Sequence, residues 1–254
     1  MKSVLLAATL LTVSALAADP AALRPEVERR VAADYPALLA FYTDLHLHPE
    51  LSFLEAETSA KVATALRAAG FTVTEKFAGY GLVGVLQNGP GPTLLIRTDL
   101  DALPVQEETG LPYASTVHMK DLSGHDVPVM QACGHDIHMT VFTGTARMLS
   151  GLKDHWSGTL VFVGQHAEER GSGARALLAA GLYHKFPKPD FAVALHDSAT
   201  LPAGTLGTVE GYVMGNVDTV EITVRGVGGH GAYPHATKDP IVLASALVMR
   251  LQTI

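Results

Sequence analysis

The chain has one cysteine, no cluster of lysine or arginine and no histidine-rich tract. A single cysteine excludes an internal disulfide bond. The missing basic cluster, together with a net charge of −7, excludes nucleic acids and other polyanions as expected partners. Without a histidine-rich tract, metal scavenging is disfavoured as a function. The 254 residues, 48% hydrophobic and 17% charged, suffice for one large or two modest globular domains.

The N-terminus has the pattern of a secretory signal peptide. After Lys2, an apolar run from Val4 to Leu16 ends in small residues around Ala17. A short positive start, about a dozen apolar residues and small residues at the end are typical of a cleaved signal. The run is too short to span a bilayer comfortably. We expect removal of residues 1–17 and a periplasmic or secreted protein; an ordinary first helix is the alternative.

Strand and helix patterns alternate along the middle of the chain. Apolar runs without polar alternation predict strands with both faces buried at 93–97, 159–163 and 191–195. Two shorter strands are expected at 71–74 and 82–86. Helical apolar spacing predicts helices at 25–42, 55–69, 135–149 and 174–182. This alternation predicts an α/β fold with a mostly parallel sheet flanked by helices, here assigned to residues 18–214.

Residues of metal-ligand type stand near the ends of these strands and around the cysteine. They are Asp99, Asp101, Cys133, His135, Glu168, Glu169 and His196. Because ligands bind at the carboxyl ends of parallel strands, we expect these side chains to converge on one rim of the sheet. Each has an ordinary alternative when taken singly, since a strand-end aspartate is often a turn former or helix cap, and a lone cysteine is often a small buried residue.

Two pairs at a spacing of two residues are candidates for shared metal binding. Cys133 and His135 would point the same way on extended backbone. His46 and His48 offer a second pair, which we disfavour because no acid at a nearby strand end completes it. The long segment 103–131, rich in Pro, Thr, Ser and Gly, is expected to be a functional loop.

The composition changes after Gly204. Residues 217–225 alternate apolar and polar side chains, which predicts a strand with one solvated face in a separate antiparallel layer. A glycine-rich turn at 226–235 carries two histidines, and a helix is expected over 240–254. We expect residues 215–254 to begin a second, small domain that is cut off within this helix.

Six segments together resemble a known family of enzymes. They are LHLHPELSFLEAET, RTDLDALPVQEETGLPYAS, QACGHDIH, the Glu168-Glu169 pair with GSGARALLAAGL, ALHDSATLPAGTLG and GVGGHGAYPHATKDP. The chain resembles metal-dependent amidohydrolases that include hippurate hydrolase, bacterial N-acyl-amino-acid hydrolases and plant auxin-conjugate hydrolases, relatives of aminoacylase and carboxypeptidase G. The likeness covers about residues 35 to 254 in consistent order.

The resemblance implies a two-metal centre. Its ligands would be Cys133, His135, Glu169 and His196. A thiolate with imidazoles and a carboxylate suits zinc or manganese, with cobalt or nickel as alternatives. The implied fold is a zinc-peptidase-like catalytic domain followed by the start of an α+β dimerisation or lid domain, and the full-length form is expected to be a homodimer.

The resemblance also implies the catalytic roles. Glu168 would be the general base, Asp101 a carboxylate that steadies a ligand, and His230 a substrate-binding residue. On extended backbone, Glu168 and Glu169 would face opposite ways, so that one binds metal and the other stays free. Asp99 stands where many peptidase relatives have histidine, and its combination with Cys133 matches the amidohydrolase branch. His166 departs from the proline usual in relatives, which removes a constraint on φ.

The implied activity is hydrolysis of the amide bond of N-acyl amino acids or similar small amides. Relatives of this kind take a further metal-ligand histidine and more strands from sequence beyond the small domain. We therefore expect the 254-residue chain to have damaged or absent activity. The alternative is a catalytically silent relative that keeps a partial metal site and acts by binding or association.

Overall fold

The computed structural model describes residues 20–215 and 217–254. The chain divides into two compact units, the first ending at Ala199 and the second spanning Thr200–Ile254. The predicted signal peptide lies outside the described residues. Among the residues that the structure describes, no helix is both long enough and apolar enough to cross a membrane.

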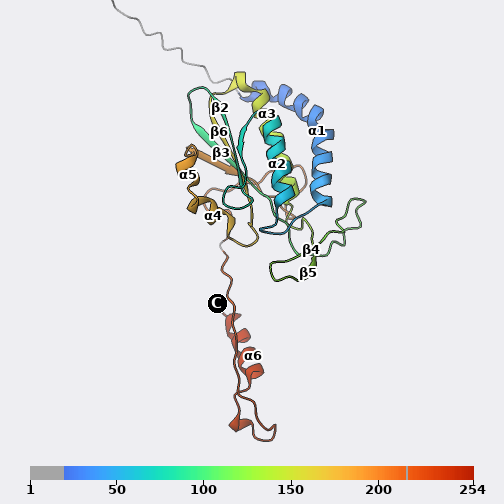
Figure 1. The fold of residues 1–254 in the computed structure, drawn as a ribbon, viewed down its shortest axis with the longest axis vertical. Coiled ribbons are helices and arrows are strands. Elements are labelled where there is room, and N and C mark those ends of the chain that lie inside the picture. Colours follow the sequence, from blue (N-terminus) through green and yellow to red (C-terminus); the bar gives the residue numbers. More distant parts are fainter. Residues whose placement is uncertain (1–19, 216) are drawn as a thin grey trace, which may run out of the picture. The chain divides into compact units, whose positions relative to one another are not determined.

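A mixed five-stranded sheet forms the centre of the first unit (Figure 1). Its order is β1 (Thr72–Thr74), β2 (Leu82–Asn88), β6 (Gly158–Gln165), β3 (Thr93–Asp99) and β7 (Phe191–Ala194). β6 pairs antiparallel with β2 and parallel with β3, which in turn pairs parallel with β7. Since β1 is antiparallel to β2, only β2 runs against the other strands of this sheet. The predicted mostly parallel arrangement is confirmed.

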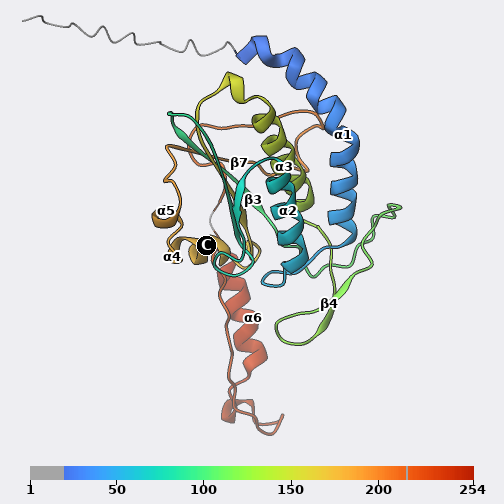
Figure 2. The ribbon, with the colours of Figure 1, turned by 45° about the horizontal axis from the view of Figure 1, so that its top comes forward.

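Helices cover both faces of this sheet (Figure 2). On one side lie α1 (Arg24–Leu47), α2 (Ala56–Ala68) and α3 (His135–Gly151), and on the other α4 (Gly173–Ala179) and α5 (Leu182–Lys185). Side chains alternate along β6: Leu160 and Phe162 join the core under α2 and α3, while Val161 and Val163 pack with Leu177 of α4. Both faces of β6 are therefore buried, as the continuous apolar run predicts. The same prediction is wrong for β7, whose four residues are all exposed, because β7 lies at the edge of the sheet.

Among its described residues, the first unit also contains four short elements. They are the 3₁₀ helices η1 (Pro20–Leu23) and η2 (Lys153–His155), and the hairpin of β4 (His118–Lys120) and β5 (Asp126–Pro128). The hairpin lies within the predicted loop 103–131, which a bridge between Leu103 and Met130 closes. α1 runs on to Leu47, beyond the expected end at residue 42, because the restraint imposed by Pro49 reaches back only to His48.

The second unit has little regular structure. It contains η3 (Pro234–Ala236), α6 (Pro240–Leu251) and a bridge between Val227 and Lys238. The strand expected at 217–225 is wrong for this structure, because all nine residues lack strand pairing. A strand needs a neighbour for its backbone groups, and the described residues of this unit offer none. An α+β dimerisation domain is therefore not evident there.

Candidate metal centre

Cys133 and His135 reach a common point by a route that differs from the expected one. The backbone between them is a turn followed by the first residue of α3, whereas extended backbone was predicted. Gly134 adopts a left-handed φ of 71°, and a Cβ at this position would lie 2.7 Å from the carboxylate of Asp197. Only glycine fits both conditions without strain. The tight turn therefore brings the thiol and the imidazole together.

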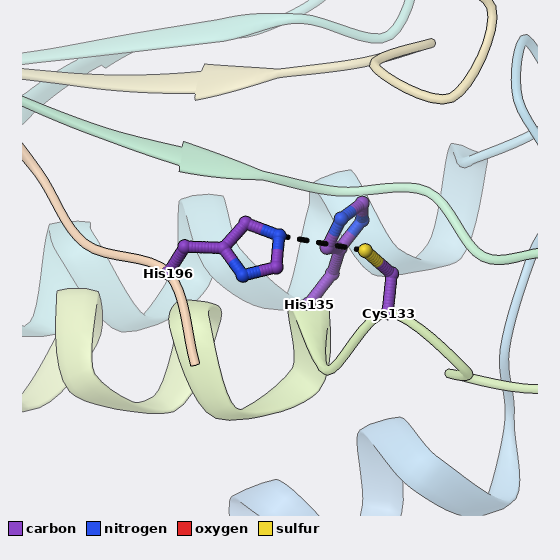
Figure 3. A group of neighbouring side chains, drawn as sticks. All are labelled: Cys133, His135 and His196. Carbon is purple, nitrogen blue, oxygen red and sulfur yellow. Dashed lines mark hydrogen bonds between the residues drawn. The ribbon is translucent and has the colours of Figure 1, made fainter. Parts of the chain in front are cut away.

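A thiol and two imidazoles meet at the start of α3 (Figure 3). One ligand atom from each of Cys133, His135 and His196 lies within 4.8 Å of the others. The Sγ of Cys133 is 3.4 Å from the Nε2 of His196. The other ring nitrogen of His196, Nδ1, donates to the carbonyl oxygen of Asp197 at 2.7 Å. This bond fixes the proton on Nδ1 and leaves the lone pair of Nε2 facing the thiol.

His135 is oriented in the same manner, and its free nitrogen lies close to two carboxylates. Its Nδ1 donates to the carbonyl oxygen of Asp101 at 2.7 Å. Its Nε2 lies 3.8 Å from Glu168 Oε2 and 3.7 Å from Glu169 Oε1. His135 Nε2 and Glu169 Oε1 are buried, yet neither makes a hydrogen bond to any residue that the structure describes. Buried polar atoms without partners are costly, and a cation between them would satisfy both.

The charges around the cluster also fit a metal. Burial and the Glu169 carboxylate raise the pKa of the Cys133 thiol to about 12. Burial alone would lower the pKa of His135, but its hydrogen bond to Asp101 and the charge of Asp99 raise it to about 9. The site thus gathers negative charge that a divalent cation would compensate. Sulfur, nitrogen and oxygen donors together suit zinc and related first-row metals.

Asp101 supports the cluster from behind. Its Oδ2 accepts hydrogen bonds from Ser52 Oγ at 2.6 Å and from the Glu169 N–H at 3.0 Å. Burial acts to raise the pKa of Asp101, but hydrogen bonds from His135 and Ser52 outweigh it and lower the pKa below its ordinary value. Asp101 therefore stays ionised while it holds both His135 and the backbone of Glu169.

Glu168 and Glu169 are not on extended backbone, so that part of the prediction is wrong. They lie in a turn closed by the Gly171 N–H, which donates to the Glu168 carbonyl at 2.7 Å. Both carboxylates consequently approach the Nε2 of His135. They differ in exposure: the side chain of Glu168 is 38% exposed and that of Glu169 is 18% exposed. The turn separates a more accessible acid from a more buried one.

His138 was missed as a site residue. Its Nε2 accepts the Asp197 N–H at 3.0 Å, so Nδ1 carries the proton and faces Asp99 Oδ2 at 3.3 Å. The Asp99 carboxylate also pairs with Arg97. His138 thus links Asp99, the last residue of β3, to Asp197, the residue after His196. The spacing of His135 and His138, three residues apart on one helix face, was the available signal.

The other predicted histidines lie outside the cluster. His46 is buried and His48 is exposed, so they do not form the alternative metal pair. His166 is buried against Phe53, with ring centroids 6.1 Å apart. His230 belongs to the second unit, where its Nδ1 accepts the Ala232 N–H at 3.1 Å. Its role in binding substrate stays a prediction.

Residues 95–251 match the model of Peptidase family M20/M25/M40. The chain belongs to this family. It is 37% identical, over 87% of its own length, to an N-acetylcysteine deacetylase of Bacillus subtilis, and 38% identical, over 85%, to an N-acetyldiaminopimelate deacetylase of that species. It covers 56% and 55% of those two relatives, and so spans about half the length of the curated relatives it matches.

A solved member of the family has the same fold. It is a dinuclear metal-binding peptidase of family M20 from Bacillus subtilis, 36% identical, with a TM-score of 0.63. The likeness covers 71% of this chain and 47% of that one. Membership of Peptidase family M20/M25/M40 confirms the resemblance identified from the six sequence segments.

Proposed function

We propose that the protein is a metal-dependent amidohydrolase that cleaves the amide bond of N-acyl amino acids. The observation that carries the proposal is the buried Nε2 of His135, which faces acidic oxygens without a hydrogen bond to any described residue. The names of the deacetylase relatives support N-acyl amino acids as the substrate class.

The ligands proposed for two divalent ions are Cys133, His135, Glu169 and His196. These residues offer one sulfur, two imidazole nitrogens and carboxylate oxygens at one place in the first unit. Zinc or manganese suits this donor set, with cobalt or nickel as alternatives. A divalent ion bound there would supply a water of lowered pKa and a Lewis acid for the substrate carbonyl.

Glu168 is the proposed general base. Its side chain is more exposed than that of Glu169, which leaves its carboxylate free to meet a substrate. Burial and the charge of Asp99 raise the pKa of Glu168, which strengthens the carboxylate as a proton acceptor. Glu168 would accept the proton of the attacking water and return it to the leaving amine. Asp101 would keep His135 and the Glu169 backbone in place during this transfer.

The test is Glu168→Gln, which keeps the shape of the side chain but cannot accept the proton. In a parent that hydrolyses N-acetyl amino acids, we expect the rate to fall about a hundred- to ten-thousandfold on this substitution, while metal content stays nearly unchanged. Activity is followed by release of the free amine, and metal by elemental analysis. If parent and variant are equally silent with metal bound, the non-catalytic alternative replaces this proposal.

Export and assembly are separate proposals. The N-terminal pattern supports secretion or periplasmic location, and N-terminal sequencing of the protein from cell fractions tests it, with cleavage after residue 17 as the expected result. We also propose that the protein forms a homodimer in which His230 binds substrate. Size-exclusion chromatography tests the dimer, and a rise in KM on His230→Ala tests the contact.

A further inference from the structure

One fully buried acid is not among the proposed metal ligands. Glu55, just before α2, has a relative exposure of 0%. Its Oε1 accepts two backbone hydrogen bonds, from the Phe53 N–H at 2.9 Å and from the Ala167 N–H at 2.7 Å. Ala167 is 112 residues away in sequence and directly precedes Glu168. Glu55 therefore connects the start of α2 to the loop of the two acids.

Both residues that donate these hydrogen bonds have unfavourable backbone conformations. Phe53 has φ 68° and Ala167 has φ 48°, in the left-handed region that residues with a Cβ rarely adopt. Such conformations persist only where the surroundings fix them, and they concentrate at functional sites. A single carboxylate oxygen fixes the N–H of both residues.

Ala167 is held on its carbonyl side as well. Its oxygen accepts the N–H groups of Ser172 and Gly173, both at 3.2 Å. With the Glu55 bond on the N–H side, both backbone polar groups of this buried residue are occupied. The turn that contains Glu168 and Glu169 starts immediately afterwards, so its direction follows from the conformation at Ala167.

The same short segment before α2 also supports Glu169, through a second residue. Ser52 donates to Asp101 Oδ2, and that oxygen also accepts the Glu169 N–H. Residues 52–55 thus hold the acid pair at two points: Glu55 acts at Ala167, and Ser52 acts through Asp101 at Glu169. Ser52 only strengthens the support that the Asp101 carboxylate already gives to Glu169. Glu55, in contrast, is the hydrogen-bond acceptor for the Ala167 N–H.

We infer that Glu55 is a positioning residue, which fixes the left-handed backbone at Ala167 and so directs the Glu168 and Glu169 carboxylates toward His135. The expected effect on metal affinity rests on the proposed function, but the expected effect on the backbone at Ala167 does not. The role needs an acceptor oxygen and no charge. Burial raises the pKa of Glu55 to about 7, and its Oε2 makes no hydrogen bond to any described residue, so a neutral side chain of the same shape can serve.

The experiment compares Glu55→Ala, which removes the acceptor, with Glu55→Gln, which keeps it. Two quantities are measured on the 254-residue chain: hydrogen exchange at the Ala167 amide, and affinity for Co²⁺ followed by its absorption spectrum. The control for general loss of stability is Leu66→Ala. Leu66 is a core residue of α2, 0% exposed, and lies outside the loop that contains Glu168 and Glu169.

For Glu55→Ala we expect exchange at Ala167 to be about ten- to a hundredfold faster and Co²⁺ affinity to fall about ten- to a hundredfold. Glu55→Gln should keep both values within about threefold of the parent. Leu66→Ala should lower Tm without changing Co²⁺ affinity in the folded protein. Parent-like exchange in folded Glu55→Ala, or an equal loss in Glu55→Gln, would overturn the inference.

A rescue variant separates this role from simple stabilisation. Glycine adopts positive φ without penalty, so Ala167→Gly in the Glu55→Ala background should recover part of the Co²⁺ affinity. No recovery would count against control of the backbone. If Glu55→Ala does not fold, Glu55→Asp takes its place, since it keeps the charge but withdraws the oxygen. A parent chain that binds no Co²⁺ would defeat the proposed function alone, because exchange at Ala167 still decides the inference.

Discussion

Two buried histidines of the first unit have opposite surroundings. His46 uses both ring nitrogens, with Nδ1 2.6 Å from Asp136 Oδ2 and Nε2 3.1 Å from Glu107 Oε1. His135 uses only Nδ1, on a backbone carbonyl, and leaves Nε2 without a hydrogen bond to any described residue. The two regions adjoin, because Asp136 follows His135 in the chain.

The difference shows how a structural histidine is told from a ligand. A ring whose two nitrogens both pair with carboxylates has no nitrogen left over for a metal. A ring held at one nitrogen by a carbonyl presents the other nitrogen to a cation. His46 therefore stabilises the fold beside the centre, while His135 belongs to the centre itself.

The largest expected effect is on stability, at His46. His46→Ala leaves Asp136 and Glu107 buried without their cation, so we expect a loss of about 3–5 kcal/mol in the free energy of unfolding. Urea denaturation measures it. The matched control is His48→Ala, an exposed residue two positions on, which should change stability by less than about 0.5 kcal/mol. Equal effects of the two substitutions would remove the distinction drawn for His46.

The next effect is on metal affinity, at His135. His135→Ala removes the nitrogen that faces both acids, and we expect the affinity for Zn²⁺ to fall at least about a hundredfold. Isothermal titration calorimetry at constant pH measures it. His48→Ala should keep the parent affinity. Parent-like affinity in His135→Ala would show that the metal binds elsewhere, and His135 would then not differ from His46 as a ligand.

The smallest effect is the pH dependence of the His46 contribution. Burial alone would lower the pKa of His46, but its hydrogen bonds with Glu107 and Asp136 raise it above the ordinary value. A histidine whose pKa is raised in the folded state contributes its full stabilisation of the fold below about pH 6.5, the ordinary pKa. This contribution is lost as pH rises through the folded-state pKa.

The stability difference between the parent and His46→Ala should therefore shrink from pH 6 to pH 9, by about 1 kcal/mol. Denaturation at several pH values measures the trend. A difference that grows with pH would contradict the assignment of charge to His46.

The sequence predicted the layers of the fold because they depend on local pattern. Continuous apolar runs became β3, β6 and β7, and helical spacing became α1 to α4, with errors mainly at the ends. The strand expected at 217–225 failed because alternation states only which face could be buried, and pairing needs a neighbouring strand. The sequence pattern predicts which face of a strand can be buried, but not which strand pairs with it.

The sequence by itself determined which donors are present, their order along the chain and their place near the ends of core strands. Only the tertiary structure decided how they meet: through a left-handed turn at Gly134, a turn at Glu168 and Glu169, and a bond from Glu55 across 112 residues. Backbone strain and contacts between distant segments arise from packing, so they leave no local pattern to read. The same holds for His46 and His135, whose roles are set by neighbours that the fold brings to them.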